Sequence, residues 1–322
     1  MRLRPFAAAL TVALALGVPL GIALGTLVRG KTSRAREAPD PAFGAYWHDG
    51  KAELDGYRYT LTRYGQKRRG QAVAVYVTEP FSKSKNVKVD DPARNPRDTF
   101  DVLKLNLVRD FQTGIYDYNT MTSLFVRSED LEPVKVSFSS TEWCGNVYEE
   151  LRLDPGLVTQ KLSSYFEDES ATRAERRPRG GLLEEELFVR LRGLNGEFLR
   201  PGESKDFPFL PSAFRRRLAH QPLQWTSARV ERLASNRTVL VPAGRFEATV
   251  YVVRIANGAE GSFFIEARHP HRVLRWEWKH LSAVDADELA ELAGSERLQY
   301  WKLHGEGDER YLARLGLKPD PK

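Results

Sequence analysis

The stretch 134–153 (VKVSFSSTEWCGNVYEELRL) constrains the fold most, because it alternates apolar and polar side chains over an unusual length. The apolar positions of its first half are Val134, Val136 and Phe138. This period of two is typical of a strand with one buried face. From Trp143 onward the apolar residues fall on odd instead of even positions. A bulge or tight turn must intervene near 139–141 or at 145–146, so we expect a long, kinked strand at the centre of a β-sheet.

The same alternation recurs on both sides of this stretch. The predicted strands span residues 54–64, 72–77, 103–108, 157–166, 225–233, 238–241, 245–255, 262–267 and 273–280. Their spacing suits antiparallel pairing. One stretch instead repeats leucine at positions 183, 187, 191 and 194, which predicts a helix around 182–194. We therefore expect a mainly β protein, a curved antiparallel sheet with few helices, and this helix packed on the sheet.

Segments without alternation divide the chain. Residues 29–42 are charged and bear prolines, which indicates a linker, so the fold should begin near Phe43. Residues 167–181 combine charge with Pro178 and two glycines, and are predicted to form a surface loop. This loop separates an N-terminal β region, 43–181, from a helix and C-terminal meander, 182–322. The alternative is one continuous domain.

Two further segments carry local predictions. Residues 201–222 are rich in proline and are interpreted as an irregular arm with a short helix over Phe214–His220. Near the C-terminus, Asp285 is suited to cap a short helix over Ala286–Ala293.

The first 28 residues have the pattern of an export segment. Arg2 and Arg4 precede an apolar run over residues 6–28, which is long enough to span a bilayer. The small residues around Leu24 favour a cleaved signal peptide, whereas the basic residues that start at Arg29 favour a retained anchor. Both outcomes predict a periplasmic or otherwise extracytoplasmic protein, anchored in the inner membrane and associated with it through residues 6–28 if they are retained.

Charge gives little indication of a nucleic-acid partner. The chain has 49 basic and 43 acidic residues, and they are interspersed, whereas nucleic-acid binding needs basic charge gathered on one surface. The one dense basic run is Arg215–Arg217, which we interpret as a solvated helix face rather than a phosphate site.

Catalytic and metal-binding motifs are missing from the sequence. It has no glycine-rich phosphate loop, no His-Glu-x-x-His, no Gly-x-Ser-x-Gly and no paired-cysteine metal spacing. His269 and His271 flank Pro270, a composition more typical of a turn than of a ligand pair. We predict neither a metal nor a cofactor, and the missing motifs lower the expectation of an enzyme without excluding one.

The single cysteine, Cys144, cannot form an internal disulfide, so packing must stabilise an exported chain of this kind. One interpretation is a small buried residue beside Trp143, shielded and inert. The other is a nucleophilic or redox thiol, which needs a base. His48 is the nearest candidate histidine in the sequence.

Tryptophans give the second set of candidate site residues. Trp276 and Trp278 alternate with charged residues in the predicted strand 273–280, so an aromatic face meets either the core or a ligand. Together with Trp143 they are the candidate ligand-binding residues, although the core is the default for such a stripe.

Several short motifs of the first half resemble those of an uncharacterised family of bacterial exported proteins. They are 46–54 (YWHDGKAEL), 63–65 (RYG), 75–81 (VYVTEPF), 103–125 (with LKLN, TGIY and MTS) and 142–145 (EWCG). The resemblance covers about residues 43–195. Relatives often carry the label "septum formation inhibitor Maf", but this chain lacks both the Ser-Arg-x-x-Arg start and the alternating α/β pattern of Maf proteins.

The second half is similar to another exported domain of unknown function through residues 241–246 (VPAGRF), a Pro-Ala-Gly-x-Phe turn that leads into a strand. Domains of these two kinds are open or half β-barrels wrapped on a helix, related in shape to periplasmic lipoprotein carriers. The resemblance therefore implies a shape rather than an activity.

Three functions remain open at this point. The first is a non-enzymatic cell-envelope protein that binds a lipid, another hydrophobic or amphiphilic ligand, or an envelope protein partner. The second is an exported hydrolase or thiol-dependent enzyme that uses Cys144 with a histidine such as His48. The third is a purely structural envelope scaffold.

The predicted location can be tested directly. Because residues 6–28 follow two arginines and are long enough to engage the export machinery, alkaline phosphatase fused after Phe43 should be active. An inactive phosphatase fusion beside an active cytoplasmic reporter at the same position would contradict this prediction.

Overall fold

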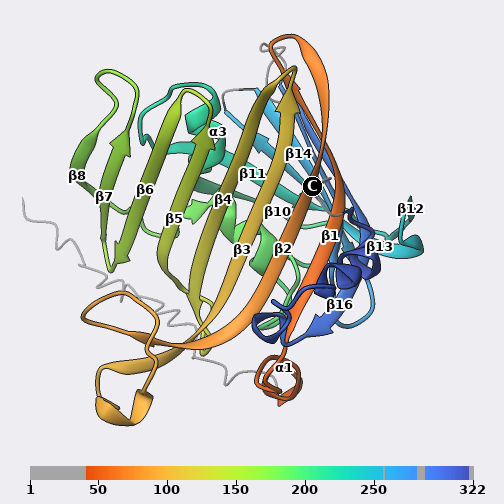
Figure 1. The fold of residues 1–322 in the computed structure, drawn as a ribbon, viewed down its shortest axis with the longest axis horizontal. Helices are drawn as coiled ribbons and strands as arrows, with labels where there is room; N and C mark the ends of the chain where they lie inside the picture. The colour runs from red at the N-terminus through yellow and green to blue at the C-terminus, as the bar shows by residue number, and fades with distance from the viewer. Residues whose placement is uncertain (1–40, 257, 281–286, 319–322) are drawn as a thin grey trace, which may run out of the picture. The chain divides into compact units, whose positions relative to one another are not determined.

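A computed structural model describes residues 41–256, 258–280 and 287–318. The described residues belong to one compact unit built on one sheet of 16 strands (Figure 1). The expected N-terminal segment, 1–28, and most of the linker lie outside the described residues. Within these residues, no helix is both long and apolar enough to cross a membrane.

The first half of the chain forms successive antiparallel hairpins, joined in one place by a long connection over residues 83–98 that contains a short 3-10 helix, η1 (Pro92–Arg94). Its other elements are α1 (Pro41–Trp47), β1 (Ala52–Arg63), β2 (Gln66–Ser82), β3 (Thr99–Thr113), β4 (Tyr116–Arg127), β5 (Pro133–Glu142), β6 (Gly145–Asp154), β7 (Leu157–Ser164) and β8 (Ala171–Arg176).

The second half continues the same sheet. Its elements are β9 (Leu182–Leu183), η2 (Glu184–Glu186), α2 (Leu187–Arg190), β10 (Ser204–Leu210), α3 (Ala213–Leu218), β11 (Thr226–Arg232), β12 (Arg237–Val241), β13 (Gly244–Ile255), β14 (Ala259–Glu266), β15 (Val273–His280), β16 (Glu288–Leu298), η3 (Tyr300–Lys302) and η4 (Asp308–Leu315). The order along the sheet is β8-β7-β6-β5-β4-β3-β2-β1-β16-β15-β14-β13-β11-β10-β9, and β12 pairs with β13. The first and last strands, β1 and β16, are therefore neighbours.

The predicted fold class is confirmed: the chain is mostly β, with few helices and a large curved sheet that stays open. The division at residue 181 stays a prediction. Two details of the sequence interpretation need correction. Residues 167–181 include strand β8, and residues 288–298 form β16 instead of a helix. The proposed cap at Asp285 lies outside the described residues.

The central stretch is a hairpin and not one kinked strand. β5 ends at Glu142, the turn occupies Trp143 and Cys144, and β6 starts at Gly145, which pairs with Glu142. Cross-strand partners share a face of the sheet, so the even positions of β5 continue as the odd positions of β6. A two-residue turn thus produces the parity change for which the sequence suggested a bulge or a turn at neighbouring positions.

The leucine-rich stretch is also shorter as a helix than its spacing predicts. Leu182 and Leu183 pair as a strand with Phe209 and Leu210, and helical turns cover only residues 184–190. Leu183, Leu187 and Leu191 still bury their side chains, and Leu194 is half-buried.

The curved sheet is filled by the chain's own helices and aromatic residues. Trp276 of β15 packs against Tyr57 of β1 and Phe188 of α2, with ring centroids 4.7 and 5.1 Å apart. In Figure 1, α3 lies behind β4 and β5. Its arginines bind carboxylates of β5 and β6, which confirms that α3 packs on this part of the sheet.

Three consecutive arginines of α3 are buried, which makes the prediction of a solvated face wrong. Each pairs with a glutamate of a different element. The pairs are Arg215–Glu184 at 2.9 Å, Arg216–Glu149 at 2.9 Å and Arg217–Glu142 at 2.8 Å. Two of them lie between α3 and the adjacent strands of one hairpin, so these ion pairs connect the irregular arm to the sheet.

The pKa values of two adjacent buried glutamates of η2 shift in opposite directions. Burial alone would raise the pKa of Glu184, but the Arg215 guanidinium and the hydrogen bond from the Ser212 N–H together hold that pKa below its ordinary value. Burial and the adjacent Glu184 carboxylate raise the pKa of Glu185 to about 7, because the hydrogen bond that its carboxylate accepts from the Ala213 N–H only partly opposes them. Glu185 therefore holds a proton in the folded protein over a pH range in which it is ionised in the unfolded chain.

These two residues form a matched test. Glu184→Gln leaves the Arg215 charge buried without its partner and should lower the free energy of unfolding at neutral pH by about 3–5 kcal/mol.

For Glu185, the free energy of unfolding falls as pH rises from the pKa of the unfolded chain to about 7, since the proton bound in the native state is lost. Glu185→Gln should remove this loss and be more stable than the wild type at pH 8, with little difference at pH 4.5. Urea denaturation at both pH values measures this, and a Glu185→Gln variant less stable at pH 8 would contradict it.

Candidate functional site

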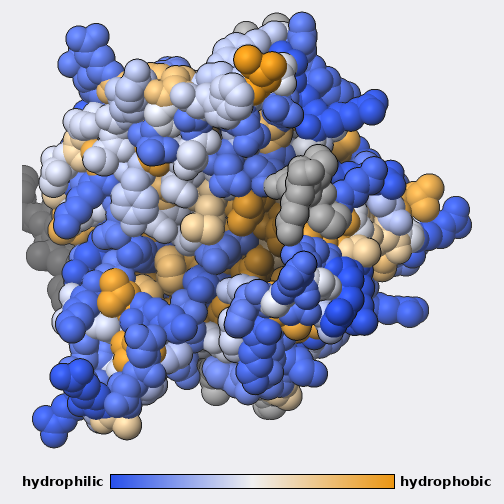
Figure 2. All heavy atoms as spheres, in the orientation of Figure 1, coloured by the Kyte–Doolittle hydropathy of each residue, from blue (hydrophilic) through white to orange (hydrophobic). Residues whose placement is uncertain are grey.

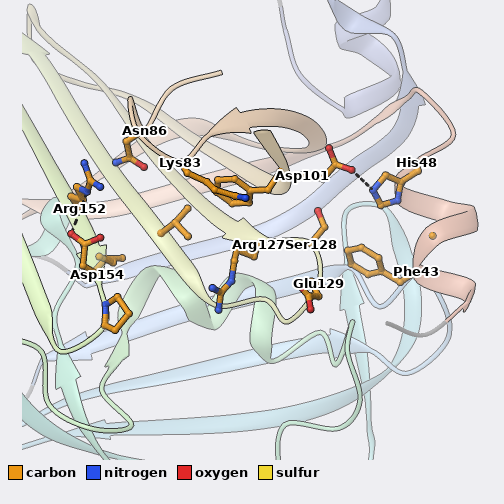
Figure 3. Close-up of a pocket in the computed structure, with 15 residues that line it drawn as sticks. Phe43, His48, Lys83, Asn86, Asp101, Arg127, Ser128, Glu129, Arg152 and Asp154 are labelled. Atoms are coloured by element: carbon orange, nitrogen blue, oxygen red, sulfur yellow. Dashed lines mark ion pairs between the residues drawn. The ribbon is translucent and has the colours of Figure 1, made fainter. Parts of the chain in front are cut away.

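A cavity of about 730 Å³ lies where the ends of several strands meet α1 (Figure 3). Its lining residues are Phe43, Gly44, His48, Lys83, Asn86, Phe100, Asp101, Arg127, Ser128, Glu129, Val134, Arg152, Leu153, Asp154 and Pro155. They come from α1, the connection after β2, the start of β3, the β4–β5 turn and the β6–β7 turn. The meander brings all these segments to one end of the sheet.

Helix α1 forms one wall of the cavity. Trp47 anchors this helix, because its buried ring packs at 6.0 Å from Tyr76 of β2 and lies under the Arg192 guanidinium. Phe43 packs one turn earlier against Trp47, at 6.2 Å. Gly44 adds no side chain, and a Cβ built on it meets no atom within 4 Å. The absence of a side chain at Gly44 therefore keeps this wall open.

Charged side chains around the cavity are arranged in pairs of opposite sign. His48 Nε2 lies 3.8 Å from Asp101 Oδ2, and Arg152 Nε lies 3.2 Å from Asp154 Oδ2. Arg127 donates through two nitrogens to Asp130, at 2.6 and 2.9 Å. Positively and negatively charged groups thus lie close together. The lining offers hydrogen-bond donors and acceptors without a strong excess of positive or negative charge.

Two smaller cavities lie within the fold. One, of about 140 Å³, borders Glu149, Arg216 and Arg217, which already pair with one another or with Glu142. The other, beside Glu184, Glu185 and Phe188, measures about 10 Å³, close to the lower limit for a single water. Of these cavities, only the one beside α1 is large enough for an organic ligand.

The structure places Cys144 on the surface, so the expectation of a buried thiol is wrong. Cys144 occupies the second position of the β5–β6 turn, where the side chain projects beyond the hydrogen-bonded strands. Its Sγ contacts the Tyr116 hydroxyl and lies 3.9 Å from Glu142 Oε2. These neighbours do not provide the imidazole base that a cysteine nucleophile needs.

His48 lies at the opposite end of the sheet from Cys144. His48 is next to Asp101, near the start of β3, whereas Cys144 contacts Tyr116, which follows the end of β3 at Thr113. A strand rises about 3.4 Å per residue, so these two ends of β3 are roughly 40 Å apart. The structure does not bring the two residues together, so the alternative that pairs Cys144 with His48 is wrong.

The three candidate tryptophans fall into two environments. Trp276 and Trp278 are buried, Trp276 donates to Glu288 Oε1 at 2.9 Å, and the Arg215 guanidinium lies over the Trp278 ring. Their burial fits a role in the core. Trp143 is exposed beside Cys144 in the β5–β6 turn, at the end of the sheet opposite the cavity.

Sequence reasoning missed most of the residues that line the cavity. Phe100, Asp101, Arg127 and Arg152 lie at strand ends, and no spacing in the sequence connects them. The one available signal was the change from apolar alternation to charged residues at the ends of successive strands. Among the described residues, no group of three or more His, Cys, Asp or Glu side chains could hold a metal ion.

Comparison with known proteins gives little further information. No protein-family model matches the chain, and no curated protein matches it at a significant level. A matching crystal structure, from Bacteroides fragilis, is described as a presumed exported protein with a YmcC-like fold. The two chains share 11% identity over 76% of this chain and 95% of the other, with a TM-score of 0.22. This similarity is too low to carry an argument, and both family resemblances stay predictions.

The exposed position of Cys144 predicts its reactivity. A maleimide should label Cys144 in the folded protein about as fast as it does in urea, because the turn does not cover the thiol. Cys144→Ala should change the free energy of unfolding by less than about 0.5 kcal/mol, since surface substitutions usually have small effects. Labelling that is at least tenfold slower in the folded protein than in urea would contradict the exposed position.

Proposed function

We propose that the protein is a non-enzymatic, exported cell-envelope protein that binds an amphiphilic ligand in the cavity beside α1. The observation that carries this proposal is the cavity itself, about 730 Å³ with a mixed apolar and charged lining. This volume lies in the range typical of small-molecule sites. The interior of the curved sheet is occupied by α2, α3 and aromatic side chains, so we place the ligand at the strand ends and not inside the curve.

The lining suits a ligand with separate apolar and polar parts. Its apolar surface comes from side chains of α1 and of the ends of β3, β5 and β6. These are Phe43, Phe100, Val134, Leu153 and Pro155. The polar part would face the paired charges at Arg127 and Arg152. Because each of these guanidiniums already has a carboxylate partner, a headgroup of low net charge fits better than a multiply charged anion.

The position of the cavity agrees with a membrane-associated role. The described chain begins at Pro41, in the helix that lines the cavity. If residues 6–28 stay in the membrane as an anchor, the 12 residues of 29–40 span at most roughly 40 Å when extended. The anchor would then hold the protein close to a source of amphiphilic ligands.

Filling the cavity from Gly44 tests this function. Gly44→Trp should reduce the amount of amphiphile that co-purifies with full-length protein from its native envelope by at least about tenfold, because the indole would occupy cavity volume. Gly44→Ala is the matched control. It should retain the ligand and raise stability by about 0.5–1 kcal/mol, because alanine replaces glycine within a helix.

Native mass spectrometry and lipid extraction measure the bound material. Wild-type protein free of any amphiphile would contradict the proposal and favour a purely structural scaffold. Equal amounts of ligand on wild type and Gly44→Trp, with both proteins folded by circular dichroism, would place the ligand elsewhere.

A further inference from the structure

The end of the sheet opposite α1 exposes a large apolar or aromatic side chain at each of four neighbouring turns. These are Tyr64 (57% exposed) between β1 and β2, Ile115 (77%) between β3 and β4, Trp143 (66%) between β5 and β6, and Tyr165 (65%) after β7. Figure 1 shows these turns along the upper end of the sheet, with α1 at the lower end. The face shown in Figure 2 is mainly hydrophilic, with hydrophobic side chains gathered around a hollow near its centre and in smaller groups elsewhere.

The turns form a row with regular spacing. The hairpins β1–β2, β3–β4, β5–β6 and β7–β8 are consecutive in the sheet. Since neighbouring strands lie about 4.8 Å apart, successive turns are about 10 Å apart. The side chains at these turns are linked by aromatic residues of β4 that lie between them.

Rigid aromatic contacts support these projecting residues. The Tyr64 hydroxyl lies 2.8 Å from that of Tyr118, and the Tyr116 ring is 5.1 Å from Tyr118 and 6.4 Å from Trp143. Tyr118 in turn stacks on Phe111 at 4.7 Å. These contacts support the exposed side chains of Tyr64 and Trp143 from below.

The exposed charged residues differ in sign from one turn of this row to the next. Exposed Lys67 and Arg69 follow the first turn on β2, and Asp117 is the exposed acidic residue next to the second turn. Glu167 and Asp168 follow Tyr165 and make the last turn acidic. We therefore define the tip row as Tyr64, Ile115 and Trp143 together with Lys67 and Arg69, and leave Tyr165 out.

We propose that the tip row docks onto the surface of a lipid bilayer that contains anionic headgroups. Tryptophan and tyrosine prefer the membrane–water interface, where the ring is partly apolar and the polar atom stays hydrated. Lys67 and Arg69 complement anionic headgroups. We choose a bilayer as the occupant because the row combines side chains that prefer the membrane–water interface with exposed basic residues that complement anionic headgroups.

This contact is independent of the proposed ligand, because the tip row and the cavity lie at opposite ends of the same strands. The described chain begins at Pro41, at the α1 end of the sheet. A local measurement at the tips therefore distinguishes docking from any binding through residues 6–28.

The single cysteine provides this local measurement. Full-length protein is labelled at Cys144 with an environment-sensitive fluorophore and mixed with phosphatidylcholine vesicles, with or without 30% phosphatidylglycerol. With phosphatidylglycerol, the emission should shift to shorter wavelength, and lipids with a spin label near the headgroup should quench it. The double variant Ile115→Ser/Trp143→Ser should lower the apparent affinity for these vesicles at least about tenfold.

Two further variants separate charge from general surface changes. Lys67→Gln/Arg69→Gln should weaken the response to phosphatidylglycerol and its dependence on salt. Leu240→Ser is the matched control, because Leu240 is also exposed, at 72%, but belongs to β12 and lies outside the tip row. It should leave the response unchanged.

No response to either vesicle would overturn the proposal. The same holds if the double variant, folded by circular dichroism, responds like the wild type, or if the fluorophore responds only to lipid-free envelope proteins. Failure of the Gly44→Trp test would not affect this result, because that test concerns the cavity.

Discussion

The ion pairs between α3 and its three glutamates are the interaction on which the interior depends. Burying a guanidinium and a carboxylate is costly, and only close pairing with full hydrogen bonding offsets that cost. The carboxylates come from β5, β6 and η2, so α3 reaches all of them in one position only. We infer that the pairs of Arg216 and Arg217 fix the position of the 201–222 arm against β5 and β6, and that the Arg215–Glu184 pair fixes α3 against η2, more than they contribute net stability. The arm then fills the curve and leaves the larger cavity at the strand ends.

Sequence patterns predicted the strands because a period of two reports directly which face of a strand is buried. They could not predict the role of Arg215–Arg217, since burial of a charge depends on partners that are distant in sequence. Glu149 and Glu142 lie 67 and 75 residues before the arginines that bind them. The leucine spacing at 183–191 failed for a related reason: β10 offers Leu182 and Leu183 a strand partner, and this tertiary pairing overrides helical periodicity.

The candidate site was less predictable than the fold. Its lining comes from the ends of several elements, and each contributes one or two residues whose meaning appears only when the meander is folded. The prediction for Cys144 failed for a different reason. Its neighbour Trp143 suggested a packed environment, but a turn position exposes both residues whatever their hydrophobicity. The cavity with its apolar and charged lining lies at one end of the strands, and the exposed aromatic side chains lie at the other end. This arrangement depends on the direction of each strand in the sheet, which could not be predicted from the sequence.

The pairing of β1 with β16 also governs how the chain can assemble. The first strand to be synthesised, β1, hydrogen-bonds to β2 on one side. Its other edge pairs with β16, the last strand, which is synthesised only after almost all of the described chain. Contacts this distant in sequence slow folding, and an unpaired strand edge invites pairing with other chains. We therefore expect the seam between the two halves to close late in folding, and a truncation that removes β16 would leave two incomplete sheets with exposed edges. A chain delivered from its N-terminus would need protection of β1 until its C-terminal strands arrive.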